Sequence, residues 1–275
     1  MDIPSEATVL DEIAVKGVRI AFRRAGTGPP LILLHGGPTD SREWSRQIGP
    51  LSVSRTVVAW DMPGCGASDD PPPNWLAPRD YADCLAEFIR ALGLSHPDVI
   101  GLSFGSGLAL ELYRWYPELP RSLILASAYA GWAGSLPPEA VEQRKQMILR
   151  QIDSPPEEWA EQWLPTLVTE SAAPEVVALL RTILLGFHPE GQRALIRARF
   201  PEHDVRTVLS EISVPTLLIY GETDVRSPLT VATEMHAAIP GSQLVVISGA
   251  GHECGLEAAD AFNAAVTAFL QAVGS

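Results

Sequence analysis

Ser103 lies in the pentapeptide Gly101-Leu102-Ser103-Phe104-Gly105, between a strand-like run at 98–100 and a helical pattern at 108–116. A serine on a sharp turn from strand to helix exposes its hydroxyl at the edge of a sheet, where it can act as a nucleophile. The flanking glycines let strand and helix approach closely, and the amide N–H of Phe104 would point at an oxyanion formed on the substrate. A glycine-bordered helix start is the alternative interpretation of the same five residues.

An acid and a base follow Ser103 in the order that one type of catalytic triad needs. The segment Tyr220-Gly221-Glu222-Thr223-Asp224 ends an apolar run, and Gly249-Ala250-Gly251-His252 directly follows the last such run. We predict that Asp224 orients His252 as the base, with Glu222 as the rival acid. Glycines beside the histidine are typical of a mobile loop. All three groups follow predicted strands, at the edge where ligands bind in open α/β sheets.

The tetrapeptide His35-Gly36-Gly37-Pro38 comes directly after another apolar run. Its two glycines allow the backbone to turn towards the site, so we expect Gly36 beside the substrate. The amide of Gly37 is the predicted second oxyanion donor, because Pro38 has no N–H. We interpret His35 as a residue that braces this loop, and a simple β-turn is the alternative for the whole segment.

Apolar runs that alternate with helical patterns must position these groups. Six runs without polar alternation predict buried parallel strands, at residues 31–34, 56–59, 99–101, 123–126, 216–220 and 244–247. Two earlier strand-like runs, 8–14 and 18–24, flank Lys16-Gly17 and predict a hairpin. Helical spacing of apolar residues is seen at Tyr81, Leu85, Phe88, Ile89 and Leu92, and again at Phe262, Val266, Phe269 and Val273. The alternation predicts a doubly wound α/β sheet.

Residues 131–200 break this alternation. They contain no convincing strand but several helical stretches that open at prolines, near Pro137-Pro138, Pro155-Pro156, Pro174 and Pro189. An all-helical insert of this size predicts a lid over one edge of the sheet. We expect its apolar residues to include substrate contacts from Trp132, Trp163, Leu184 and Phe187, although such residues more often pack in a core.

Composition narrows the class of protein and its partners. Acidic residues outnumber basic ones by 33 to 20 in the 275-residue chain, and a net charge of −13 disfavours nucleic acids and anionic membranes as partners. Residues 1–10 lack a signal-peptide pattern and no run approaches the ~20 apolar residues of a membrane span, so we predict a cytoplasmic protein. Neither a metal nor another cofactor is predicted, because no CxxC pair or metal-ligand spacing occurs among Cys65, Cys84, Cys254, His96, His188, His203 and His236.

Together these motifs resemble the α/β-hydrolase superfamily over nearly the whole chain. Residues 61–68, Asp-Met-Pro-Gly-Cys-Gly-Ala-Ser, are similar to its D-x-P-G-x-G-x-S turn. The resemblance implies an eight-stranded sheet that is antiparallel only at its second strand. It also implies a hydrolase core of residues 1–130 and 201–275, with a helical cap at 131–200. Ser106 stands where many relatives have glycine, a change that we expect to be tolerated.

The predicted activity is hydrolysis of small to medium carboxylic esters by a Ser-His-Asp acyl-enzyme mechanism. The stretch 249–263 is similar to small carboxylesterases and enol-lactonases, so an enol-lactone or acyl-homoserine lactone is the alternative substrate. Residues 35–38 are similar to proline iminopeptidases, which would need a buried acidic pair for the substrate ammonium. A ligand-binding protein on a hydrolase scaffold would keep the same triad. The oligomeric state is not predicted.

Overall fold

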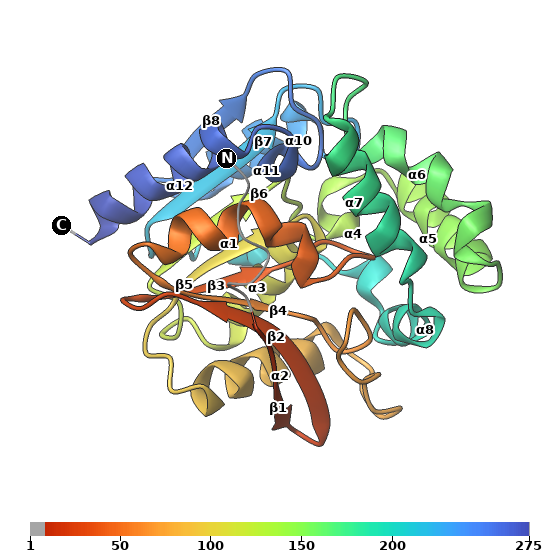
Figure 1. Cartoon of the computed structure of the whole chain (residues 1–275), viewed down its shortest axis with the longest axis horizontal. Helices are drawn as coiled ribbons and strands as arrows, with labels where there is room; N and C mark the ends of the chain where they lie inside the picture. The colour runs from red at the N-terminus through yellow and green to blue at the C-terminus, as the bar shows by residue number, and fades with distance from the viewer. Residues whose placement is uncertain (1–8, 275) are drawn as a thin grey trace.

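A single eight-stranded sheet with helices on both faces organises the chain (Figure 1). The structure is a computed structural model and describes residues 9–274. Residue 8, where the first strand is predicted to begin, lies outside the described residues. So do most of residues 1–10, on which the prediction about a signal peptide rests. The predicted hairpin joins β1 (Val9–Val15) to β2 (Val18–Ala25), and Lys16 and Gly17 both have positive φ between them.

The sheet confirms the predicted α/β-hydrolase architecture. The other strands are β3 (Pro30–Leu34), β4 (Thr56–Trp60), β5 (Asp98–Leu102), β6 (Ser122–Ala126), β7 (Thr216–Gly221) and β8 (Gln243–Ile247). Their order is β1-β2-β4-β3-β5-β6-β7-β8, and β2 alone runs opposite to the direction of the other strands. Parallel strands align their carboxyl ends, so the segments after β3, β5, β7 and β8 meet at one edge.

The burial of β8 differs from the prediction. Residues 244–247 were expected to form a buried strand, but β8 lies at the end of the sheet order, and only Ile247 within it is buried. Val246 is 43% exposed. An edge strand has a neighbour on one side only, so an apolar run can form there without complete burial. An apolar run alone does not distinguish an edge strand from a central one.

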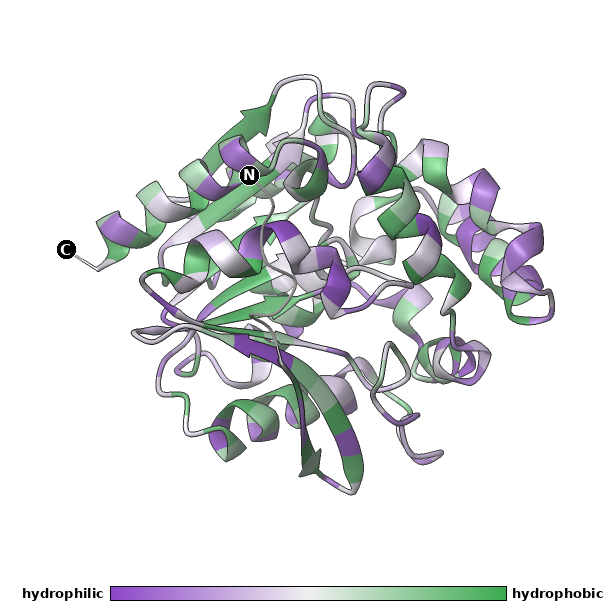
Figure 2. Ribbon diagram, in the orientation of Figure 1, coloured by the Kyte–Doolittle hydropathy of each residue, from purple (hydrophilic) through white to green (hydrophobic). Residues whose placement is uncertain are grey.

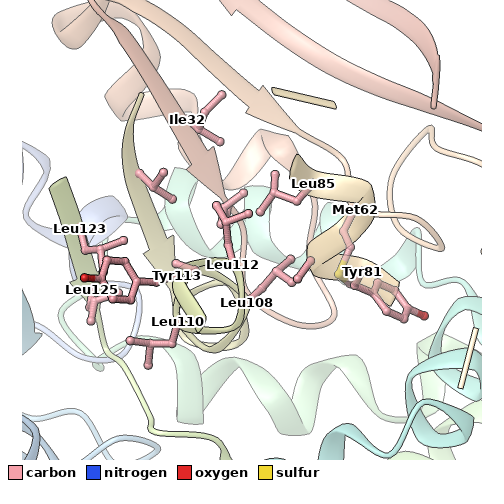
Figure 3. Packing of buried hydrophobic residues seen from close by; sticks show 14 of the residues in the cluster. Ile32, Met62, Tyr81, Leu85, Leu108, Leu110, Leu112, Tyr113, Leu123 and Leu125 are labelled. Atoms are coloured by element: carbon pink, nitrogen blue, oxygen red, sulfur yellow. The ribbon is translucent and has the colours of Figure 1, made fainter. Parts of the chain in front are cut away.

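Two apolar layers hold the sheet between the helices. On one face, α1 (Ser45–Ser52) and α12 (Ala259–Val273) pack against the strands. On the other face the packing helices are α2 (Pro78–Ala91), α3 (Phe104–Trp115) and α10 (Leu229–Ala238). Figure 3 shows side chains of α2, α3 and the strands meeting in this second layer, among them Leu85, Leu108 and Ile32. Figure 2 shows hydrophobic strands inside and mixed helix faces around them, the pattern of a doubly wound sheet.

Six helices lie between β6 and β7, and the first five of them gather on one side of the molecule (Figure 1). We call residues 131–200 the helical insertion. It contains α4 (Trp132–Ser135), α5 (Pro138–Ile152), α6 (Ala160–Leu167), α7 (Pro174–Leu185) and α8 (Pro189–Arg197), with a short 3₁₀ turn at Pro156–Glu158. A second 3₁₀ turn, Phe200–Glu202, begins at its last residue. Its own apolar cluster includes Trp159, Leu164 and Leu180. The insertion therefore has a core separate from the two layers of the sheet.

The remaining short elements are a 3₁₀ turn at Ser41–Trp44, α9 (Arg206–Leu209) and α11 (Cys254–Glu257). Among the helices of residues 9–274, none is both long and apolar enough to cross a membrane.

Candidate active site

Ser103 occupies the turn between β5 and α3 in a strained backbone conformation, with φ 50° and ψ −111°. The glycines on either side are required by close backbone contacts. A Cβ on Gly101 would lie 2.4 Å from the carbonyl oxygen of Gly105, and a Cβ on Gly105 would lie 2.2 Å from that of Leu34. The Ser103 amide donates to the Ala126 carbonyl at 2.8 Å, which fixes the turn to β6. The sequence therefore builds a rigid turn that presents one hydroxyl.

Asp224 and His252 come together from the segments after β7 and β8. The Nδ1 atom of His252 lies 2.9 and 3.0 Å from the two carboxylate oxygens of Asp224. The same carboxylate accepts the amides of Arg226 and Ser227 at 2.8 and 2.9 Å. Burial raises the pKa of Asp224, but the hydrogen bond and charge of His252 and these two amides outweigh it and hold that pKa below its usual value. Asp224 is therefore an ionised partner that orients the imidazole.

Glu222, the rival acid, lies on the surface. Its carboxylate accepts the Ser248 hydroxyl at 2.7 Å and the Gly249 amide at 2.9 Å. It thus supports the loop after β8 and makes no contact with the His252 ring.

The loop that carries His252, whose glycines are typical of a mobile loop, is hydrogen-bonded to its neighbours on two sides. The hydroxyl of Ser127 donates to the His252 carbonyl at 2.9 Å, and the Glu253 amide donates to the Leu167 carbonyl at 2.9 Å. Glu257 accepts the Gly251 amide at 2.7 Å and also the Thr169 amide at 2.8 Å. Hydrogen bonds from both the core and the helical insertion therefore hold the histidine in place.

Burial lowers the pKa of His252, and the charges of Arg226 and Arg144 lower it further, against the opposing effect of Asp224. The neutral imidazole is the form that accepts a proton, so it should persist below the ordinary histidine range of about 6.5. We expect the acid limb of the kcat/KM profile on a non-ionising ester to have its midpoint below pH 6.5. A midpoint at or above 6.5 would contradict this assignment of His252 as the base.

The His35-Gly36-Gly37-Pro38 loop lies against the start of α3. A Cβ on Gly37 would lie 3.4 Å from Cβ of Phe104, so the two predicted oxyanion donors belong to adjacent segments. His35 braces this loop: its Nε2 accepts the Met62 amide at 3.0 Å, and its Nδ1 lies 2.7 Å from the Gly36 carbonyl oxygen. The Gly36 amide donates to Glu43 at 2.8 Å, so it supports the loop and is turned away from the cavity.

A pair of buried glutamates, Glu43 and Glu253, connects this loop to the segment that carries His252. Both side chains are almost completely buried and hydrogen-bonded to each other. Glu43 already accepts from the Gly36 amide and the Thr39 hydroxyl, which makes it the acceptor of the pair. Burial raises the pKa of Glu253 well above its usual range, and the Glu43 charge raises it further. Glu253 is therefore the protonated donor. Sequence reasoning missed this pair because its members are separated by 210 residues.

This pair gives a pH-dependent stability prediction. The pKa of Glu253 is higher in the folded state than in the unfolded state. The protonated side chain therefore contributes fully to the free energy of unfolding below about pH 4.5, and this contribution is lost as the pH rises through the folded-state pKa. Glu253→Gln keeps a donor for Glu43 but does not ionise. We expect the Tm of the variant, relative to wild type, to increase between pH 5 and pH 8. The exposed Glu234→Gln is the control, and a Tm difference for Glu253→Gln that does not grow with pH would contradict the prediction.

Ser103 opens into a cavity of about 870 Å³, its mouth included, between the core and the helical insertion. Gly37 and Phe104 line the cavity. The predicted substrate contacts Trp132, Trp163 and Phe187 also lie in its wall. Leu184 does not, because its side chain is completely buried within the apolar cluster of the insertion and has no surface left towards the cavity. Helical spacing alone therefore does not distinguish Leu184, in the core of the insertion, from Phe187, in the cavity wall.

His252 borders a second opening, between residues 164–172 of the insertion and the loops after β7 and β8. In the described structure no hydrogen bond joins the side chains of Ser103 and His252. Catalytic hydrogen bonds of this kind are often long in free enzymes and tighten when substrate binds.

The cavity wall contains polar residues that sequence reasoning did not assign to the site. They are Tyr129, Arg144, Gln151, Gln192, His203 and Arg226. His203 was expected to be exposed or locally bonded, and it is a buried side chain whose Nε2 lies 2.8 Å from the Glu111 carboxylate on α3. The sequence contains no local signal for these residues, because they come from five separate segments. Among residues 9–274, no group of three or more His, Cys, Asp or Glu side chains is arranged to hold a metal ion.

Comparisons with known proteins agree with this fold and define its class. The chain belongs to the alpha/beta hydrolase family, whose model matches residues 31–265. It is 32% identical to a thermophilic esterase from Thermogutta terrifontis, studied with malate bound, over 97% of this chain and 100% of that one, with a TM-score of 0.87.

Two further relatives show the range of the family. A 2-hydroxymuconate semialdehyde hydrolase from Pseudomonas putida is 28% identical over 98% of this chain and 97% of its own length. The enol-lactonase from Burkholderia xenovorans LB400 is 24% identical with a TM-score of 0.79, over 95% of this chain and 100% of that one. At this identity the enol-lactonase supports the fold alone. The family and these relatives identify the chain as a hydrolase.

Proposed function

We propose that this protein is a serine hydrolase that cleaves small to medium carboxylic esters. The observation that carries the proposal is Ser103 on its strained turn, at the same sheet edge as the buried Asp224–His252 pair. The esterase from Thermogutta terrifontis, at 32% identity over nearly both whole chains, supports the same reaction class.

The proposed reaction has two stages. His252 accepts the Ser103 proton at Nε2 as the hydroxyl oxygen attacks the ester carbonyl carbon, and the resulting oxyanion accepts from the Gly37 and Phe104 amides. Collapse breaks the bond to the alcohol, which leaves with the proton from His252, and an acyl-enzyme remains. His252 then takes a proton from water as the water attacks the acyl carbon. Collapse breaks the bond to the Ser103 oxygen, which receives that proton from His252 as the acid leaves. Each oxyanion donor contributes roughly 3 kcal/mol to transition-state stabilisation.

The helical insertion is proposed to act as a lid. Trp132, Trp163 and Phe187 from the insertion and Phe104 from the core enclose the cavity above Ser103. An apolar roof of this kind favours compact substrates, because a polymer would have to displace it.

The cavity favours an ester over the N-terminal proline of a peptide. An iminopeptidase needs carboxylates for the substrate ammonium. The glutamates of the insertion, such as Glu139 and Glu161, are exposed and lie outside the cavity wall. Arginines line the wall instead. A lactone is a cyclic ester that the same groups would attack, so lactones belong in the test.

The test is a panel of p-nitrophenyl esters and of enol- and acyl-homoserine lactones, with a prolyl anilide as comparison. We expect an initial burst of p-nitrophenol, or steady turnover, on short-chain esters. Cleavage of the prolyl anilide alone would overturn the ester assignment. Binding of esters without a burst or turnover would instead favour a ligand-binding protein.

A further inference from the structure

Two arginines lie in the wall of the cavity that contains Ser103, and each comes from a different part of the fold. Arg144 belongs to α5 of the helical insertion, whereas Arg226 follows Asp224 in the core. Both side chains are half-buried in a wall that is otherwise largely aromatic and aliphatic. Cationic side chains in such a wall need an explanation, because burying a charge is costly unless it is compensated.

Arg144 is held in place by neutral groups. Its guanidinium donates to the Tyr129 hydroxyl at 3.0 Å and to the Arg226 carbonyl at 2.9 Å. Its charged carbon also lies 5.3 Å from the ring centre of Tyr129 and 5.5 Å from that of Trp132. These contacts fix the position of the cation but leave its charge without an opposite charge.

Arg226 has a similar environment. Its guanidinium donates to the Thr166 hydroxyl at 3.0 Å and lies 4.4 Å from the centre of the Trp163 ring. The nearest acid in sequence, Asp224, receives the backbone amide of Arg226 and is engaged with His252. Burial lowers the pKa of Arg226, and the nearby charge of Asp224 opposes this effect without reversing it.

The free hydrogen-bonding capacity of the two side chains is large. A guanidinium has five N–H groups, so the pair has ten, of which three donate to protein acceptors in the described structure. Neither arginine forms an ion pair with an Asp or Glu of residues 9–274, whereas Arg55 and Arg121, which are also partly buried, share Asp98. A planar guanidinium can bind the two oxygens of a carboxylate through two parallel hydrogen bonds.

A second observation points to a ligand in the same place. Trp163, over which Arg226 stacks, is 5% exposed, and its buried indole N–H has no hydrogen-bond partner in the described structure. A buried donor without a partner is costly, so it is expected to have an acceptor in the working enzyme. The Trp163 side chain lies in the cavity wall with the two arginines.

We propose that the substrate carries a carboxylate besides its scissile ester or lactone bond, and that Arg144 and Arg226 bind this carboxylate in the cavity above Ser103. The inference rests on the proposed ester hydrolysis and specifies its substrate class. Because one arginine belongs to the insertion and the other to the core, the bound carboxylate also ties the lid to the core. A carboxylate carries one charge, so bringing it into the apolar wall costs less desolvation than bringing in a phosphate dianion.

The test compares matched methyl esters that differ in one terminal group. Monomethyl succinate, glutarate and adipate carry a carboxylate where methyl butyrate, valerate and hexanoate carry a methyl group. We expect wild type to prefer the carboxylate member of at least one pair by roughly tenfold or more in kcat/KM. Arg144→Met and Arg226→Met should each lower that preference roughly 10- to 100-fold, and Arg144→Lys should keep part of it.

Arg150→Met is the matched control, because Arg150 lies exposed on the same helix α5 as Arg144 and outside the cavity wall. It should leave the preference unchanged. Equal or better cleavage of every neutral ester by wild type would overturn the inference and leave the proposed ester hydrolysis intact. Preference for a phosphonate analogue over the matched carboxylate would overturn the assignment to carboxylates.

Failure of the proposed function has a different signature. If wild type cleaves no ester, the proposed ester hydrolysis is overturned. Binding of a dicarboxylate then tests whether Arg144 and Arg226 form a carboxylate site. Calorimetry with glutarate and adipate on Ser103→Ala should show binding that Arg144→Met weakens roughly tenfold or more. No binding of either dicarboxylate would overturn the inference.

Discussion

Replacing Ser103 by alanine is expected to lower kcat on a short-chain ester by roughly five to six orders of magnitude. The hydroxyl is the only group of the proposed site that bonds to the substrate, so its loss removes the acyl-enzyme route entirely. The oxyanion amides and the cavity would remain, which leaves a small residual rate above that in water. Turnover measured with a p-nitrophenyl ester checks this result.

The control for this variant is Ser106→Ala, one helical turn further along α3. The Ser106 hydroxyl donates to the Ser103 carbonyl and is completely buried, so it has the same chemistry without access to substrate. We expect its turnover to stay within about tenfold of wild type. A reactive phosphonate should modify Ser103 in wild type, as shown by the mass of the tryptic peptide. Labelling of another serine, or full activity of Ser103→Ala, would remove Ser103 as the nucleophile.

The sequence predicted the sheet well because its signals are local. Glycines around Ser103 and the apolar runs before and after it are read within a few residues, and backbone crowding at Gly105 and Leu34 explains why those glycines are needed. The prolines of the insertion began helices where expected, at Pro138, Pro174 and Pro189. Each of these features depends on the conformation of one short segment.

Groups that depend on long-range contacts were not predictable in this way. Glu43 and Glu253 look like ordinary surface glutamates in the sequence, and only packing of the segments after β3 and β8 makes them a buried pair. Arg144 likewise lies on a helix rich in charged residues, and its tertiary neighbours alone distinguish it from Arg150. A single sequence does not record which of several like residues on one helix faces a cavity.

Asp224 and Glu222 are both candidates for the acid beside His252 in the sequence, and only Asp224 contacts the imidazole in the structure. Asp224→Asn tests this assignment. The amides of Arg226 and Ser227 donate to one carboxylate oxygen of Asp224, so an asparagine would place its carbonyl oxygen there. Its NH₂ group would then face Nδ1 of His252 and require an acceptor at that nitrogen. The imidazole would carry its proton on Nε2, where it is unable to take the proton of Ser103.

We expect Asp224→Asn to lower kcat by roughly 10⁴-fold at neutral pH, with little change in KM, because the variant holds the ring in the wrong tautomer without altering the cavity. Glu222→Gln is the matched control. It makes the same carboxylate-to-amide change two residues away, at an exposed side chain that bonds Ser248 and Gly249, and should retain activity within about tenfold. The reverse order of effects would assign the role to Glu222. Both substitutions lie in the loop after β7, but only the Asp224 side chain contacts His252. A large loss of kcat in Asp224→Asn and not in Glu222→Gln would therefore come from the contact between Asp224 and the imidazole.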